Sequence, residues 1–209
     1  MLMNSRSPKE ELRRGWTTGA YAAATTAAAF KALVVGKFSP SIKITLPKGQ
    51  TPEFQLSRTE KGPDWARAGA IKDAGDDPDI THGAEVISEV RVGKLNTGII
   101  FKAGEGIGTV TLAGLPLAVG EPAINPKPRE IISEAVLKIA GEFGVPSDII
   151  ITLSIPGGEQ LAKKTMNGRL GIRGGLSILG TTGIVIPYSC ASWINSIHRG
   201  IDVARAANL

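Results

Sequence analysis

The stretch TGAYAAATTAAAFKALVV, Thr18–Val35, decides how the first part of this chain folds. It is rich in alanine, the best helix-forming residue, and it contains no proline, so it predicts a helix. Thr17 or Thr18 can cap the start of this helix, and Gly36 can end it. Small side chains on most of its faces indicate a helix that packs closely against other elements.

The rest of the chain predicts strands in hairpin-like groups with few helices between them. Alternating apolar and polar residues, or runs of isoleucine, predict strands at 41–46, 53–57, 65–72, 84–92, 99–102, 110–112 and 148–155. Apolar residues at helical spacing predict a helix at 128–143, and further helices are expected at 158–165 and 191–207. This order favours an α+β fold in two layers, a mixed or antiparallel sheet with helices packed on one face, over a regular βαβ array.

We expect three parts along the chain. Residues 1–14 are polar and charged and predict a flexible lead-in. Residues 15–190 predict one α+β domain that binds substrate and carries the catalytic groups. The helix within 191–209 has no clear stop signal, so we expect it to begin a C-terminal region that lies outside this chain.

Composition limits the class of protein. With 42% hydrophobic and 21% charged residues, the 209-residue chain has the values of an ordinary globular protein. Its net charge of +5 is scattered, and aromatic residues make up 5%, which speaks against a nucleic-acid-binding surface. The single cysteine, Cys190, excludes an internal disulfide and a cysteine-based metal cluster. Without an apolar run of ~20 residues or a signal peptide, we expect a cytoplasmic protein that does not enter a membrane.

The acidic segment KDAGDDPDITHG, 72–83, is a candidate catalytic loop. Asp73, Asp76, Asp77 or His82 could act as a general base, because histidine titrates near neutral pH. The spacing does not match the calcium-binding EF-hand, so a metal site is not expected. Aspartate, glycine and proline are also turn residues, so a succession of turns explains the segment equally well.

The segment FKAGEGIGTVTLAG, 101–114, carries Gly104, Gly106 and Gly108 after a predicted strand. Rossmann methyltransferases bind their methyl donor with such a pattern, but a helix must follow it. Here the next residues predict a strand, so we expect a tight glycine hairpin instead. Its backbone could still approach a flat ligand closely.

Three further segments predict contacts with an anion. Thr17 and Thr18 stand at a helix start, where backbone N–H groups attract anions, although plain capping is the simpler interpretation. The proline-rich loop at 120–130 could direct Asn125 and Arg129 toward a carboxylate. The segment 163–183 combines glycines with cations, amides and hydroxyls but lacks the order of a P-loop, and it predicts an anion cradle. Its candidate residues are Lys163, Lys164, Asn167, Arg169, Arg173, Ser177, Thr181 and Thr182.

Taken in order, RRGWTTGAYAAA, KDAGDDPDITHG, GEGIGTVT, GEPAINPKPRE and NGRLGIRGGLSILGTTGIV resemble the hallmark stretches of the cobalt-precorrin-5B C1-methyltransferase family of anaerobic cobalamin biosynthesis. The resemblance runs from about Arg13 to Pro187. Many family members have Cys where this chain has Tyr21, which argues against a required thiol there. Family members are also considerably longer and continue with a further domain.

The resemblance implies an S-adenosylmethionine-dependent methyltransferase that methylates C-1 of cobalt-precorrin-5B to give cobalt-precorrin-6A. It implies a fold unlike that of the enzymes that methylate other ring positions, and cobalt would be present only as part of the substrate. The implied partner is a small corrin intermediate with many carboxylates, and a homodimer is an open option. Substrate would contact Thr17, Thr18, Asn125, Arg129, Lys163, Asn167, Arg169 and Arg173. The methyl donor would contact Gly104, Glu105, Gly106, Gly108, Ser177, Thr181 and Thr182.

Two other classes remain open from the sequence. The segment 168–183 could serve a phosphate-binding enzyme. The chain could also be a non-catalytic subunit that binds a corrin or another polyanion.

Overall fold

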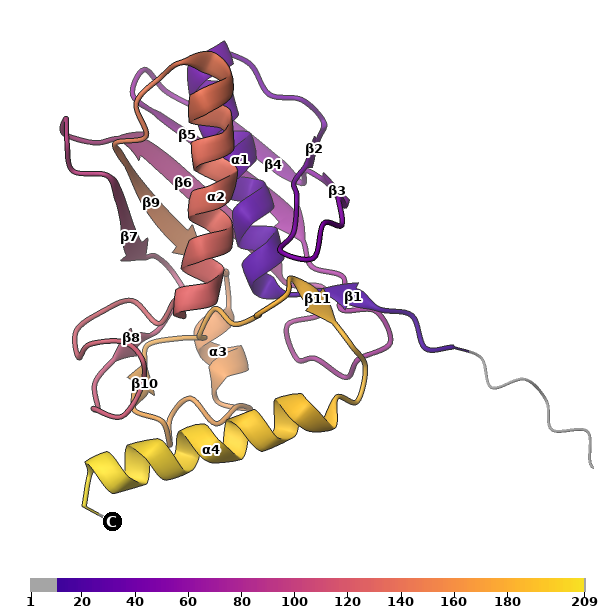
Figure 1. Ribbon diagram of the computed structural model, residues 1–209, viewed down its shortest axis with the longest axis vertical. Coiled ribbons are helices and arrows are strands. Elements are labelled where there is room, and N and C mark those ends of the chain that lie inside the picture. Colours follow the sequence, from indigo (N-terminus) through magenta and orange to yellow (C-terminus); the bar gives the residue numbers. More distant parts are fainter. Residues whose placement is uncertain (1–10, 209) are drawn as a thin grey trace, which may run out of the picture.

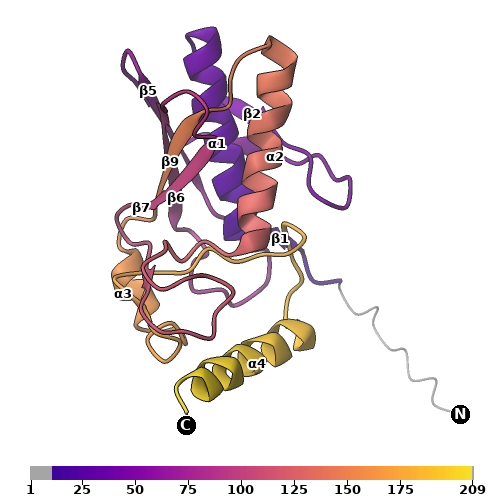
Figure 2. The ribbon, with the colours of Figure 1, turned by 60° about the vertical axis from the view of Figure 1, so that its left-hand side comes forward.

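The computed structural model describes residues 11–208 and has two layers. Helices α1 (Thr18–Val35) and α2 (Pro126–Phe143) lie side by side on one face of a five-stranded sheet (Figures 1 and 2). The sheet has the order β4-β5-β6-β9-β7, and only the pairing of β7 with β9 is parallel. Its strands are β4 (Arg58–Lys61), β5 (Trp65–Ile71), β6 (Glu85–Val92), β7 (Ile99–Ala103) and β9 (Ile149–Ser154). The predicted α+β class is confirmed, and the fold is not a Rossmann fold.

Helix α1 occupies the centre of the core because nearly all its side chains are small. The Thr17 hydroxyl accepts a hydrogen bond from the backbone N–H of Ala20 at 3.2 Å, and Gly36 ends the helix with φ +83°. Both predicted caps are confirmed. By length and composition α1 could cross a membrane, but 78% of this stretch is buried inside the fold, which is the position of a core helix.

Buried hydroxyl groups join α1 to the sheet. Ser88 on β6 lies 2.7 Å from the Thr25 hydroxyl and accepts a hydrogen bond from Thr26 at 2.9 Å. All three side chains are fully buried. These bonds satisfy polar groups that would otherwise be costly in the core, so they fix the position of the helix on the sheet.

Helix α2 begins two residues before its predicted start. Asn125 is its N-cap residue and Pro126 its first residue, a position where the missing proline N–H costs nothing. Gly144 ends the helix in the left-handed conformation, as predicted.

Three small antiparallel pairs and two helices complete the fold. β2 (Ser41–Lys43) pairs with β3 (Glu53–Gln55), β1 (Gly15–Trp16) with β11 (Ile184–Val185), and β8 (Thr109–Val110) with β10 (Ile172–Arg173). The short helix α3 (Gly158–Ala162) follows β9. The predicted glycine hairpin is wrong, because β7 pairs with β9 and β8 pairs with β10.

Helix α4 (Cys190–Ala206) runs below the two layers in Figure 1. Val203 is buried, and the backbone of Gly114 packs against this end of the helix. Trp193, Ile194 and Ile197 are exposed.

Candidate functional site

The five segments singled out in the sequence meet at one end of the two layers. This is the end where α1 and α2 begin and where β5, β7 and β9 finish, in the lower half of Figure 1. Antiparallel and parallel bridges join the segments, namely Arg14 to Gly75, Ile107 to Leu176, Thr109 to Pro122, and Ile124 to Ile178. Residues far apart in the sequence therefore form one continuous region.

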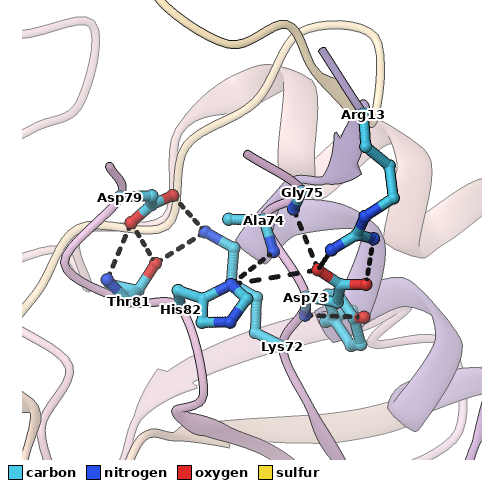
Figure 3. A network of polar contacts seen from close by, with 9 residues as sticks. Arg13, Lys72, Asp73, Ala74, Gly75, Asp79, Thr81 and His82 are labelled. Carbon is cyan, nitrogen blue, oxygen red and sulfur yellow. Dashed lines mark hydrogen bonds and ion pairs between the residues drawn. The ribbon is translucent and has the colours of Figure 1, made fainter. Parts of the chain in front are cut away.

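A buried lysine holds the acidic loop between β5 and β6. The side chain of Lys72 is 2% exposed, and its ammonium group forms an ion pair with Asp79 and donates to the Thr81 hydroxyl at 2.6 Å (Figure 3). Burial lowers the pKa of Lys72. Burial alone would raise the pKa of Asp79, but the charge of Lys72 and hydrogen bonds from Lys72 and Thr81 outweigh it and hold that pKa below its usual value.

Asp73 forms a two-point ion pair with Arg13, at 2.5 and 2.9 Å (Figure 3). The hydrogen bond from Arg13 lowers the pKa of Asp73 to about 2, and the backbone N–H of Gly75 acts in the same direction. The backbone N–H of Asp73 donates to the hydroxyl of Tyr21 at 2.9 Å. Asp73 is thus a strongly ionised carboxylate with several partners, which makes it a poor proton acceptor near neutral pH.

His82 lies beside this ion pair. Its Nδ1 accepts a hydrogen bond from the backbone N–H of Ala74 at 3.1 Å and lies 3.9 Å from Asp73 (Figure 3). The side chain is 52% exposed. Among residues 11–208 no group forms a hydrogen bond with Nε2.

The two remaining predicted catalytic residues also accept backbone hydrogen bonds. Asp76 accepts the N–H of Arg13 at 2.6 Å, and Asp77 accepts the N–H of Tyr188 at 3.0 Å. Tyr188 has φ +55°, an unusual conformation for a non-glycine residue. Arg13, near the end of the predicted lead-in, is held by the loop through its backbone and its side chain. Residues 1–10 of the lead-in lie outside the described part.

The glycines after β7 lie directly against the backbone of other chain segments. Gly106 has φ +72°, and a Cβ atom there would lie 2.0 Å from the carbonyl oxygen of Ile155. The N–H of Gly104 donates to Leu153, and the N–H of Gly108 donates to Leu176. These glycines allow chain segments to cross at short distance.

A cationic cavity of about 560 Å³, largely open to solvent, lies beside the short helix α3. Lys163, Lys164 and Arg169 line it together with Met166 and Gly168. Within the part of the chain that the structure describes, none of the three cations forms an ion pair. The structure thus brings together two predicted substrate-binding residues, Lys163 and Arg169, with Lys164.

Other residues of the predicted anion cradle hold the loop together. The buried side chain of Asn167 donates to the carbonyl of Gly175 and accepts from the hydroxyl of Ser177 at 3.2 Å. The Thr182 hydroxyl accepts the N–H of Ile184 at 3.3 Å. Thr181 and Arg173 are exposed.

The predicted anion contacts near the helix starts have protein partners. The N–H of Gly19 donates to the carbonyl of Leu179, and Thr18 is buried. The guanidinium of Arg129 donates to the carboxylate of Glu121 at 2.7 Å and to two backbone carbonyls. Asn125 caps α2 through its backbone and makes no side-chain cap.

Four residues of this region were missed as site residues by the sequence argument. Arg13 was placed in the lead-in, Tyr21 and Lys72 were given no role in the site, and Asp79 was left out of the predicted base candidates. Lys72 carried a usable signal, because a lysine at the end of an apolar strand needs a nearby acid if it is buried. Asp79 is the acid that supplies it.

The fold and this end region define an α+β protein with a polar site built from loops, distinct from Rossmann methyltransferases. The model of the CbiD family matches residues 5–187, so the chain belongs to the CbiD family.

Curated relatives carry a specific name. The chain is 59% identical over 204 residues to the cobalt-precorrin-5B C(1)-methyltransferase of Brucella anthropi, and 58% identical to that of Brucella canis. It is also similar to the crystal structure of a cobalamin biosynthesis protein, CbiD, from Archaeoglobus fulgidus, with a TM-score of 0.63 and 34% identity over 89% of this chain and 58% of that one. The alignments cover 98% of this chain but 55% of each Brucella protein, so the chain spans about half their length.

Proposed function

We propose that this chain takes part in the S-adenosylmethionine-dependent methylation of C-1 of cobalt-precorrin-5B, which gives cobalt-precorrin-6A. The observation that carries the proposal is the 59% identity over 98% of the chain to a protein named for this reaction. Cobalt would enter only as part of the substrate.

The cationic cavity supports a substrate with many carboxylates. Lys163, Lys164 and Arg169 lack ion-pair partners among the described residues, so their charges remain available to a bound anion. Arginine binds carboxylates through two parallel hydrogen bonds, and lysine acts as a point charge. We propose that these three residues bind acetate and propionate groups of the corrin ring.

Four of the residues predicted for the methyl donor have protein neighbours, whereas Glu105 and Thr181 are exposed. Gly104, Gly106 and Gly108 are packed against backbone, and Ser177 donates to Asn167. Methyl transfer depends mainly on positioning the two reactants, and the chain's own residues would contribute by holding the ring.

The proposal is tested by anaerobic incubation of the purified chain with methyl-labelled S-adenosylmethionine and cobalt-precorrin-5B, followed by mass spectrometry of the ring. Label at C-1 supports the full proposal. Substrate binding without transfer would support the non-catalytic corrin-binding alternative, and absence of binding by a folded chain would refute both.

A double variant that removes two positive charges tests the role of the cavity. Arg169→Gln combined with Lys163→Gln is expected to weaken binding of the ring by roughly tenfold or more, because two charge-assisted contacts are lost. Lys61→Gln combined with Lys94→Gln is the matched control, since both are exposed cations at the opposite end of the sheet. Equal losses in both proteins would show a general charge effect and refute the assignment.

A further inference from the structure

The tautomer of His82 is fixed by the loop that carries it. The backbone N–H of Ala74 points at Nδ1 from 3.1 Å, and a backbone N–H can only donate. Nδ1 must therefore present a lone pair, and the neutral ring carries its proton on Nε2. This assignment follows from a donor whose direction the backbone sets.

The same contact determines what the ring can offer to a ligand. A general base needs a lone pair that faces the substrate, but the lone pair of His82 faces into the loop, toward Ala74 and 3.9 Å from Asp73. The outward nitrogen, Nε2, has no partner among residues 11–208, and half of the side chain is exposed. What the ring presents outward is an N–H group.

We infer that His82 is a hydrogen-bond donor to a carboxylate of the substrate, through Nε2–H, and does not remove a proton from the ring. This inference rests on the proposed function, because it takes a carboxylated tetrapyrrole as the ligand. The ion pair of Arg13 with Asp73 and the Ala74 N–H act as the support that orients the imidazole.

The tautomer is measured without any activity assay. A long-range proton–nitrogen correlation spectrum of the chain with ¹⁵N-labelled histidine distinguishes a protonated from an unprotonated ring nitrogen. In its neutral form, His82 is expected to show an unprotonated Nδ1 and a protonated Nε2. The second histidine, His198, is exposed on α4, and its signals are assigned from His198→Gln. A proton on Nδ1 of neutral His82 would overturn the inference by itself.

Two amide substitutions separate the roles of the two ring nitrogens. The amide nitrogen of His82→Gln can take the place of Nε2–H, whereas the amide oxygen of His82→Asn can take the place of Nδ1 and keep the Ala74 bond. Uroporphyrin, a tetrapyrrole with acetate and propionate groups, serves as the probe, and its fluorescence reports binding. His82→Gln is expected to bind within about twofold of the wild type, and His82→Asn and His82→Ala to bind about tenfold more weakly, the value of one hydrogen bond to a charged group.

The outcomes separate this inference from the function beneath it. Binding that is unchanged in all three variants, or lost in His82→Gln but kept in His82→Asn, would overturn the donor role and leave the proposed substrate class standing. A wild-type chain that fails to bind uroporphyrin would overturn the substrate class, and the donor role would fall with it. His198→Gln is the control and is expected to bind as the wild type does.

Discussion

Replacement of Lys72 by methionine is expected to destabilise the protein and release the acidic loop. The lysine side chain is 2% exposed, and its ammonium group contacts Asp79 and Thr81. Breaking a fully buried ion pair costs about 3–5 kcal/mol, because the partner charge stays behind without compensation. The Asp79 side chain is 24% exposed, so water can partly hydrate it, and we expect a loss of about 2–3 kcal/mol in the free energy of unfolding.

The assay is urea denaturation followed by circular dichroism, with two comparison variants. Lys72→Met combined with Asp79→Asn removes the orphaned charge and is expected to recover at least about 1 kcal/mol of the loss, since the amide oxygen still accepts from Thr81. Lys61→Met, at an exposed position on β4, is expected to stay within about 0.5 kcal/mol of the wild type.

Two results would refute the reasoning. A loss below about 0.5 kcal/mol in Lys72→Met would place this lysine among ordinary surface residues. A double variant less stable than Lys72→Met would show that the destabilisation does not come from the charge left on Asp79.

Three other predictions concern the scaffold of the site. Ser88→Ala leaves the buried hydroxyl of Thr26 without its partner and is expected to lower the free energy of unfolding by about 1–3 kcal/mol. Adding Thr26→Val should restore part of this loss, as measured by urea denaturation. Equal losses in the single and the double variant would contradict the prediction. Gly106→Ala is expected to lower the free energy of unfolding by at least about 2 kcal/mol, because alanine would need a positive φ and its Cβ would clash with the backbone of Ile155. An unchanged midpoint of thermal unfolding would contradict this close approach of the two chain segments. The pKa of Asp73 is lowered from 3.8 to about 2, so its ion pair with Arg13 stabilises the folded state above pH 3.8, and this contribution disappears as the pH falls toward 2. Between pH 3.8 and 2, the free energy of unfolding should fall less steeply in Asp73→Asn than in the wild type. Parallel curves for the two proteins would contradict the prediction.

The elements of the fold were predictable from the sequence because their signals are local. The boundaries of α1 follow from an alanine run between a threonine cap and a glycine, and the end of α2 follows from Gly144. Alternation marked β5 and β6 within a residue of their observed ends. The pairing of β7 was not predictable, because glycine runs are typical of tight hairpins and also of chain crossings. The chain forms a crossing and not a hairpin because β7 pairs in parallel with β9, which lies about fifty residues further along the chain.

The site was predictable as a set of segments, but the roles of its residues were not. Asp73, Asp76 and Asp77 were equivalent in the sequence, and each has a different donor in the structure, namely Arg13, the Arg13 backbone and the Tyr188 backbone. These donors lie about sixty or more residues away along the chain, so no local pattern could rank the three carboxylates.

The chemistry open to this end of the molecule depends on which of its polar side chains already have hydrogen-bond or ion-pair partners within the protein. The four aspartates of the acidic loop accept hydrogen bonds from the protein, and the ionised Asp73 is unsuited to collect a proton near neutral pH. Among residues 11–208 the cations beside α3 form no ion pair, although Lys163 donates to the side chain of Gln160. Nε2 of His82 and the exposed carboxylates of Glu105 and Glu159 have no hydrogen-bond partner among the same residues. A surface of this kind is suited to bind an anion and to orient it. Methyl transfer from a sulfonium to a nucleophilic carbon requires orientation above all, and the arrangement of donors is in accord with the proposed reaction.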